Sequence, residues 1–223
     1  GPTATETIMT SVPTIEQIEY ALTLERPGLN GWSRMMPQPR AVMPPPDQRP
    51  RHAGVLLLLY PLDGRLHVVL TKRTEDLTTH KGQISLPGGG IEGEETPAAA
   101  ALREAHEELG VASDSVKVLG KLTPLYLPPS NYLVYPVVAA AATRPAFHPD
   151  PREVAEVLEV AVATLLDANS VAEETWDLRG VDTRVPYYRV GPHKVWGATA
   201  MVLAEFVTLL EQASASAASA LDR

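Results

Sequence analysis

Glutamates are concentrated between Gly89 and Val111, in the segment GGIEGEETPAAAALREAHEELGV. If the second half of this segment is a helix, about 100° of rotation per residue places Glu104, Glu107 and Glu108 on one face. Carboxylates at this spacing repel one another, and a bound cation would relieve the repulsion. Hard oxygen ligands of this kind suit Mg²⁺ or Mn²⁺. Taken alone, the helix also fits a solvated acidic surface stabilised by ion pairs.

The spacing of the charged residues and glycines resembles the Nudix box, glycine-x5-Glu-x7-Arg-Glu-U-x-Glu-Glu-x-Gly-U, in which U is apolar. Every charged and glycine position is filled, and the unusual choice is the small Ala105 at an apolar position. The resemblance implies an α/β fold, the Nudix α/β/α sandwich, in which helices enclose a mixed curved sheet and the box forms a loop-helix-loop. It also implies a Nudix pyrophosphohydrolase that uses divalent metal ions to split a diphosphate linkage in a nucleotide-like substrate.

The resemblance implies a metal site built from carboxylates of the box and a carbonyl of the glycine loop. The implied ligand set is Glu104, Glu107, Glu108, Glu95 and Gly88 or Gly89. Glu95 would act there through water or hydrogen bonds. Arg103 is counted with the helix glutamates as catalytic, because it lies one turn before Glu107 and can orient that carboxylate through a charge-assisted pair.

A general base is expected from a later segment, because its position varies among Nudix enzymes. Residues 151–157, PREVAEV, resemble the late EV-x-E segment of the family and offer Glu153 and Glu156. We favour Glu153 for a catalytic or metal-binding role. Glu156 is interpreted as a charge at a strand edge.

The segment before the box, LTKRTEDLTTHKGQISLPGG at residues 70–89, resembles the signature of the coenzyme A pyrophosphatase subgroup. Residues 191–200, GPHKVWGATA, resemble the C-terminal part of the same subgroup. The implied reaction splits coenzyme A or acyl-coenzyme A into 4′-phosphopantetheine and 3′,5′-ADP. Two positions depart from the signature: Thr78 replaces an arginine and Leu86 replaces an aromatic residue. Threonine cannot replace the contact of an arginine with a phosphate.

Two other functions stay open. The departures at Thr78 and Leu86 fit a Nudix enzyme that acts on a nucleoside triphosphate, ADP-ribose, NADH or a dinucleotide polyphosphate. A Nudix-fold regulator that binds ligand without catalysis is the third option. Such proteins tend to lose box glutamates, and here Glu95, Glu104, Glu107 and Glu108 are all present.

A basic cluster before the box is expected to bind the phosphates of the substrate. Its members are Lys72, Arg73, His80 and Lys81. His80 occupies a motif position outside any apolar pattern, whereas the two lysines fit solvated surface charges equally well. Farther along the chain, His193 and Trp196 are expected to have a structural packing role.

A capped helix over residues 97–109 is expected to position the box glutamates. Thr96 can cap the first turn, Pro97 suits that turn, and Gly110 suits the position just past the end. Strands are expected over residues 54–60, 66–71, 83–86, 116–122, 133–142 and 154–162, the first two as a hairpin. Residues 164–168 are predicted to form a turn or short helix, residues 187–190 and 194–196 a hairpin, and residues 198–212 a helix.

Composition divides the chain into three parts. Residues 1–51 are expected to contain a helix over residues 14–26, with Thr14 and Gln17 as a capping box, followed by a proline-rich arm. The arm fits a surface linker, or a contribution to a dimer interface or a substrate lid. Residues 52–212 would form the Nudix hydrolase domain, and residues 213–223 a flexible Ala/Ser tail.

The overall composition narrows the remaining classes. Cysteine is absent from the 223 residues, which excludes disulfides, zinc–cysteine sites and thiol nucleophiles. A formal net charge of −8 argues against a broad nucleic-acid surface. We expect no membrane-spanning helix and no secretory signal, and hence a cytoplasmic protein. A homodimer is an open option.

Overall fold

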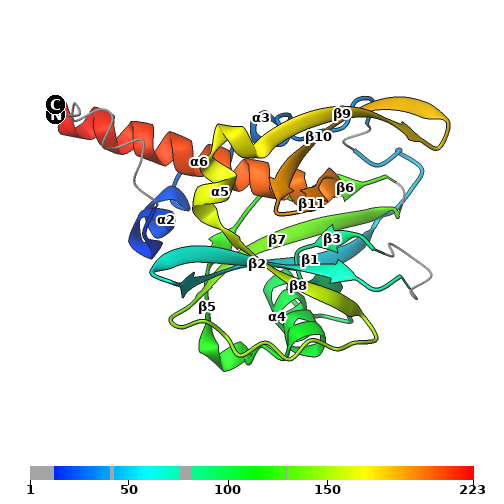
Figure 1. Cartoon of the computed structure of the whole chain (residues 1–223), viewed down its shortest axis with the longest axis horizontal. Helices are drawn as coiled ribbons and strands as arrows, with labels where there is room; N and C mark the ends of the chain where they lie inside the picture. Colours follow the sequence, from blue (N-terminus) through cyan, green and yellow to red (C-terminus); the bar gives the residue numbers. More distant parts are fainter. Residues whose placement is uncertain (1–12, 41–42, 76–81, 129) are drawn as a thin grey trace.

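The structure, a computed structural model, describes residues 13–40, 43–75, 82–128 and 130–223. Figure 1 shows a twisted sheet with helix α4 (Pro97–Leu109) on one face and helix α6 (Gly197–Leu221) on the other. This layered arrangement is the α/β/α sandwich with a mixed sheet that the box resemblance implied.

The main sheet has eight strands in the order β3-β2-β1-β7-β5, with β4 beside β1, β6 beside β7 and β8 beside β2. The strands are β1 (Arg51–Leu62), β2 (Arg65–Arg73), β3 (Ile84–Ser85), β4 (Gly88–Gly90), β5 (Val116–Lys121), β6 (Leu125–Leu127), β7 (Tyr132–Ala141) and β8 (Val154–Ala161). β1 and β7 are parallel, and the other pairs are antiparallel. The predicted strands correspond to β1, β2, β3, β5, β7 and β8, whereas the short β4 and β6 were not predicted.

Strand β1 lies in the middle of the sheet because its side chains are apolar on both faces. Leu57 and Leu59 belong to the core beneath α6, and Leu56 and Leu58 belong to the core against α4. All four side chains are fully buried. The continuous apolar run is thereby confirmed as a strand buried on both faces.

Helix α4 begins and ends where the sequence predicted. The Thr96 hydroxyl caps its first turn, and Gly110 ends it in the left-handed conformation with a φ of 70°. The helix approaches the sheet closely, because a Cβ placed on Gly54 of β1 would lie 2.3 Å from the carbonyl oxygen of Pro97. Ala105 is 1% exposed in the core between helix and sheet, where a small side chain suits the close approach.

Helix α6 is longer than predicted. It was expected to end at residue 212, but it runs from Gly197 to Leu221. The prediction of its end is wrong because alanine, which is abundant after residue 212, has the highest helix propensity. The hydroxyl of Tyr20 lies 3.2 Å from that of Ser216, so the added turns are in contact with the N-terminal part of the chain. The flexibility expected of the tail stays a prediction.

The described part of the N-terminal arm packs against α6. Helix α2 (Ile15–Ala21) has the predicted capping box and is shorter than expected. After the unpredicted helix α3 (Leu29–Trp32), the side chains of Trp32, Met35 and Met36 are buried in the α6-side core. Within the described residues, the arm is therefore attached to its own chain.

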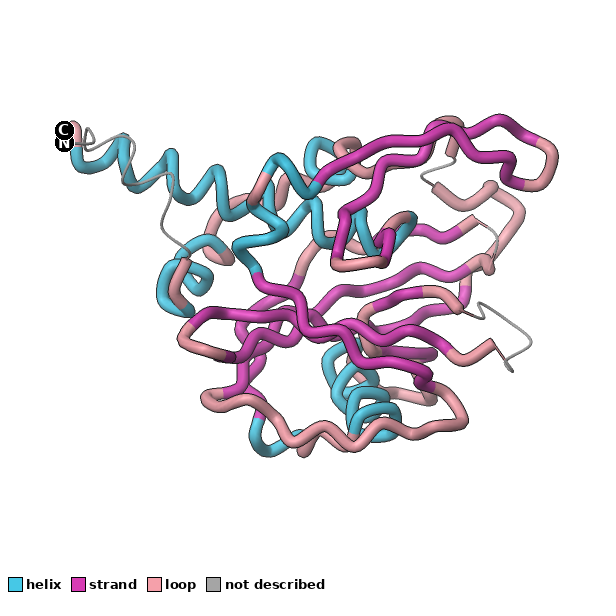
Figure 2. Tube along the Cα trace, in the orientation of Figure 1, coloured by secondary structure: helices cyan, strands magenta, loops and turns pink. Residues whose placement is uncertain are grey.

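A second sheet of three antiparallel strands adjoins the start of α6 (Figure 2). Its strands are β9 (Val171–Leu178), β10 (Val181–Val190) and β11 (His193–Val195), in the order β11-β10-β9. The predicted hairpin corresponds to the end of β10 and to β11, but β9 was not predicted. The remaining short elements are α5 (Val162–Leu166) and the 3₁₀ turns at Ser113–Ser115 and Ala168–Ser170.

Candidate active site

The three glutamates of the α4 face differ in how deeply they lie. Glu108 is 5% exposed, and its Oε2 accepts a hydrogen bond from the backbone N–H of Gly88 at 3.0 Å. Glu104 lies directly against the glycine loop, because a Cβ on Gly89 would come within 2.5 Å of its carboxyl carbon. The Glu107 side chain is 54% exposed. The helix face thus presents two carboxylates to the loop and one to solvent.

Negative charge accumulates around Glu108. Burial raises the pKa of its carboxyl to about 8, opposed by the Gly88 hydrogen bond and by Arg73, and assisted by the charges of Glu104 and Glu153. The pKa of Glu104 is raised as well, first by burial and then by the neighbouring carboxylates, while Arg103 opposes the shift. We call Glu104, Glu108 and Glu153 the carboxylate cluster. The candidate base, which the sequence placed separately, is near enough to both box glutamates to raise the pKa of each.

Arg103 points mainly at Glu95. Its guanidinium donates to Glu95 at 2.8 and 3.0 Å, to the carbonyl oxygen of Gly90 at 3.0 Å and to Glu104 at 2.9 Å. The contact with Glu107, expected to be its partner, is longer at 3.4 Å. The hydrogen bonds from Arg103 lower the pKa of Glu95. Glu95 is therefore held in an ion pair at the start of the helix, and Arg103 ties the glycine loop to the cluster.

The backbone of Glu153 is held between two distant elements. Asp150 N–H donates to the carbonyl oxygen of Glu108 at 2.9 Å, and Glu153 N–H donates to that of Asp150 at 3.0 Å. On the other side, Thr74 N–H donates to the carbonyl oxygen of Glu153 at 3.1 Å, and the Thr74 hydroxyl donates to that of Arg152 at 3.2 Å. Sequence reasoning missed Thr74 because no local pattern marks a contact between residues so far apart in the chain.

The basic residues of the segment before the box divide into two pairs. Arg73 at the end of β2 is close enough to lower the pKa of Glu108, and its buried Nε has no hydrogen-bond partner among the described residues. Lys72 lies opposite Glu156 in the β2–β8 pair and is partly exposed. Glu156 itself contacts His193, with Oε1 and Nε2 3.2 Å apart. His80 and Lys81, like Thr78, lie outside the described residues.

The chemistry of the donors fits a hard divalent cation. The described residues contain no group of three His, Asp or Glu side chains already gathered as a metal site. What they do contain is carboxylates held at one loop against electrostatic repulsion, with glycine carbonyls beside them, and the chain has no cysteine to offer a thiolate ligand. A cation with a preference for oxygen ligands would relieve that repulsion.

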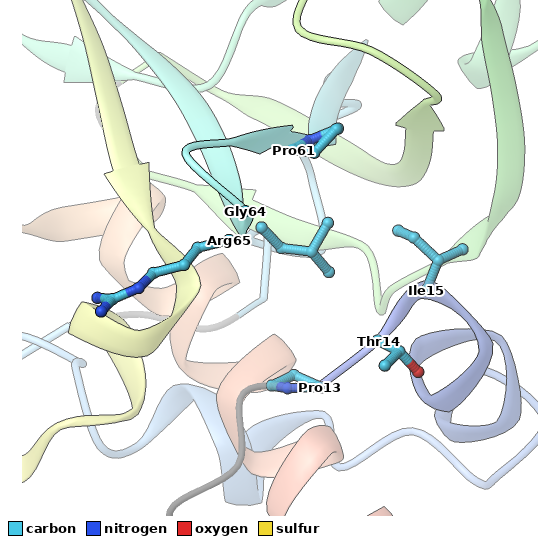
Figure 3. A pocket seen from close by; sticks show the side chains of 7 residues that line it. Pro13, Thr14, Ile15, Pro61, Gly64 and Arg65 are labelled. Carbon is cyan, nitrogen blue, oxygen red and sulfur yellow. The ribbon is translucent and has the colours of Figure 1, made fainter.

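One pocket of the described residues lies away from these carboxylates. It encloses about 320 Å³ between the start of α2 and the β1–β2 turn, and its lining includes Pro13, Pro61, Gly64 and Arg65 (Figure 3). Residues of the carboxylate cluster do not line it. Among the described residues, no helix is both long enough and apolar enough to cross a membrane.

Comparisons with known proteins agree with this geometry. A family model described as NUDIX domain matches residues 50–179. The chain is 36% identical over 166 residues to the uncharacterized Nudix hydrolase NudL of Photorhabdus laumondii, which covers 72% of this chain and 88% of that protein. It is 37% identical over 168 residues to the mitochondrial coenzyme A diphosphatase NUDT8 of Homo sapiens, covering 73% of this chain and 70% of that protein.

A solved structure shows the same fold. The crystal structure of RenU, a Nudix hydrolase from M. smegmatis, aligns with a TM-score of 0.51 at 22% identity. The alignment covers 81% of this chain and 94% of RenU.

Proposed function

The chain belongs to the Nudix hydrolase family, and from this premise we propose that it hydrolyses a diphosphate linkage in a nucleoside diphosphate derivative, with coenzyme A or acyl-coenzyme A as the first candidate. The family makes the protein a pyrophosphohydrolase. The observation that carries the proposal is the carboxylate cluster, in which Glu104 and Glu108 lie against the glycine loop and Glu153 is near enough to raise the pKa of both.

Divalent cations are the general cofactor of the family, and the metal residues we propose here are Glu104, Glu107, Glu108 and the carbonyl of Gly88. When bound, Mg²⁺ or Mn²⁺ would supply charge neutralisation at the diphosphate and a more acidic water. Glu95 would act indirectly, since its carboxylate is engaged by Arg103.

The residues of the chain itself have three proposed tasks. Glu153 accepts the proton of the attacking water as the new P–O bond forms and the bond to the leaving phosphate breaks. Arg73 and Lys72, with His80 and Lys81, bind the phosphates of the substrate. Arg103 positions Glu104 through the 2.9 Å hydrogen bond and holds the glycine loop through the carbonyl of Gly90.

Two observations support coenzyme A as the substrate. Residues 70–89 carry most of the subgroup signature. The relative NUDT8 is named a mitochondrial coenzyme A diphosphatase. Thr78 and Leu86 favour the second candidate, a Nudix pyrophosphatase acting on a nucleoside triphosphate, ADP-ribose, NADH or a dinucleotide polyphosphate. The retained box glutamates argue against a non-catalytic regulator.

The test is a product assay by mass spectrometry with Mg²⁺ or Mn²⁺ over these five substrate classes. Coenzyme A as substrate predicts 4′-phosphopantetheine and 3′,5′-ADP, and intact coenzyme A beside a cleaved competitor would select the second candidate. We expect Glu108→Gln to lower turnover by at least about 100-fold, because phosphoryl transfer depends on electrostatic stabilisation. Unchanged turnover in this variant would contradict the assigned site.

The cellular location and the oligomeric state remain predictions. We proposed a cytoplasmic protein from the sequence, whereas the relative NUDT8 is named mitochondrial. Fractionation with a tagged chain would test the location. Light scattering at several concentrations would test the homodimer.

A further inference from the structure

An aromatic group lies on the three-stranded sheet. It consists of Trp176 of β9, Tyr187 of β10 and Trp196 directly after β11, and we call it the aromatic platform. The rings of Trp176 and Trp196 meet edge to face with centroids 5.1 Å apart. The rings of Trp176 and Tyr187 are nearly parallel, with an interplanar angle of 19° and centroids 6.3 Å apart. Two of the three tryptophans in the chain are thus in one place.

The platform is separate from both hydrophobic cores of the described chain. Tyr188 and Val195, in the same strands, belong to the α6-side core, as does the third tryptophan, Trp32. Trp176 and Trp196 belong to neither core and are partly exposed. Both indole rings therefore keep part of their surface accessible to solvent, unlike the ring of Trp32.

One carboxylate fixes the polar atoms of the platform. Glu174 accepts hydrogen bonds from Trp176 Nε1 at 2.7 Å, from the Tyr187 hydroxyl at 2.9 Å and from Lys194 Nζ at 2.8 Å. Lys194 Nζ also lies 5.3 Å from the centre of the Tyr187 ring. Tyr187 is 5% exposed and supports Trp176 from within, so Trp176 and Trp196 form the accessible part of the platform. Glu174 balances the charge of Lys194 and leaves the platform without excess positive charge. This character suits a planar ring better than a phosphate.

The three-stranded sheet contacts strand β8, which begins directly after Glu153. His193 of β11 contacts Glu156 of β8 at 3.2 Å. At the start of α6, which follows β11, the Thr199 hydroxyl donates to the carbonyl oxygen of Ile84 in β3 at 3.1 Å. Glu156 is three residues after Glu153, which lies in the turn before β8, so their Cα atoms are at most about 11 Å apart. Figure 1 shows β11 on the side of the main sheet where β3 lies.

We propose that the aromatic platform binds the nucleobase of the substrate by stacking, while the diphosphate lies at the carboxylate cluster. The identity of the ligand as a substrate rests on the proposed function, but binding of a base requires no hydrolysis. Stacking on an aromatic side chain is tolerant of the base, because every base has a π face. Selection among bases would have to come from other contacts.

The first experiment measures binding of AMP and of ribose 5-phosphate, which differ by the base alone, by calorimetry and by quenching of tryptophan fluorescence. We expect AMP to bind more tightly than ribose 5-phosphate to the wild type. Trp176→Ala and Trp196→Ala should each weaken AMP binding about 5- to 100-fold and leave ribose 5-phosphate unchanged. Trp32→Phe is the matched control, since that ring is in the α6-side core, and should bind AMP normally.

Folding of each variant is checked by its thermal unfolding. If an alanine variant is unfolded, Trp176→Leu replaces it, because leucine keeps an apolar side chain but removes the stacking ring, and it should weaken AMP binding over the same range. Equal binding of AMP and ribose 5-phosphate by the wild type would overturn the proposal. So would unchanged AMP binding in folded alanine variants.

A kinetic arm separates this proposal from the hydrolase assignment. With any cleaved base-bearing diphosphate, Trp176→Ala should raise KM with little change in kcat, because the lost contact is made equally before and during the reaction. If AMP binding depends on Trp176 but the protein hydrolyses none of the substrates, the platform proposal stands and the proposed function is contradicted. If the protein hydrolyses a diphosphate and both alanine variants keep the wild-type KM and AMP affinity, the proposed function stands and the platform proposal is contradicted.

Discussion

Glu104, Glu107 and Glu108 share one face of α4 but have different environments. Glu108 is buried and bound by the Gly88 N–H, Glu104 is bound by Arg103, and Glu107 is half exposed. These differences follow from how close each side chain lies to the glycine loop. The absence of side chains at the loop glycines is therefore as important for the site as the carboxylates, because it determines how near the carboxylates can come to the loop.

Gly89→Ala tests this dependence. A Cβ at this position would lie 2.5 Å from the Glu104 carboxyl carbon, so the carboxylate must move. We expect turnover to fall at least about tenfold, since displacement of a positioned group by a fraction of an ångström affects the transition state strongly. Gly90→Ala is the matched control, because its Cβ would meet only the Tyr132 hydroxyl at 3.7 Å. Similar turnover in both variants would show that the Glu104 position is not critical.

Acid stability provides a second test at the residue scale. Hydrogen bonds from Lys194, Trp176 and Tyr187 hold the pKa of Glu174 at about 2, below its ordinary value of 4.5. The carboxylate therefore stabilises the fold above about pH 4.5, and this contribution is lost as the pH falls toward 2. We expect the wild type to have a higher Tm than Glu174→Gln at pH 6. The difference in Tm should shrink toward zero as the pH falls from 4.5 to 2.5. A constant difference over that range would contradict the assignment.

At the scale of elements, the site depends on the meeting of three chain segments. The end of α4, the end of β2 and the start of β8 are joined by backbone hydrogen bonds of Asp150, Thr74 and Glu153. Each segment contributes one part of the cluster or its support. We call this meeting point of the three segments the joint. A substitution in the joint should move Glu153 relative to α4 without altering Glu104 or Glu108.

Thr74→Val tests the joint. The side chain is 8% exposed, and its hydroxyl donates to the carbonyl oxygen of Arg152, beside Glu153. Loss of this hydrogen bond should cost about 1 kcal/mol of stability and lower kcat more than it changes KM. Thr74→Ser keeps the hydroxyl and should retain both. If valine and serine variants have the same kcat and the same pH–rate profile, the hydroxyl does not position Glu153.

At the scale of the whole molecule, the N-terminal arm and α6 form one layer above the sheet. Their joint contains Glu205, which is fully buried on α6. Its carboxylate accepts hydrogen bonds from Gly28 N–H at 2.6 Å, Thr123 N–H at 2.7 Å and the Thr123 hydroxyl at 2.6 Å. One side chain thus connects the arm, the final helix and the segment before β6.

We expect Glu205→Gln to lower the free energy of unfolding by about 2 kcal/mol, because an amide nitrogen cannot accept the hydrogen bonds that a buried carboxylate accepts. Urea unfolding measures the change. Glu211→Gln on the same helix is the control. It removes a half-exposed ion pair with Arg34 and should cost less than about 1 kcal/mol. Equal losses in the two variants would show that Glu205 does not join the layers as described.

The sequence by itself determined the features that depend on neighbouring residues. The limits of α4 follow from Thr96, Pro97 and Gly110, and the shared face of the box glutamates follows from helical periodicity. The apolar run of β1 likewise predicted a central strand. These features are local, because caps, periodicity and turns act within a few residues of the chain.

Tertiary structure decided the contacts between residues that are far apart in the chain. It placed Glu153 within electrostatic range of Glu104 and Glu108, paired Arg103 with Glu95 and placed Trp176 beside Trp196. It also extended α6 past residue 212 and paired β9 with β10. Such contacts form only when packing and hydrogen bonding between elements offset the entropy of bringing distant segments together, and no local pattern in the sequence records that balance.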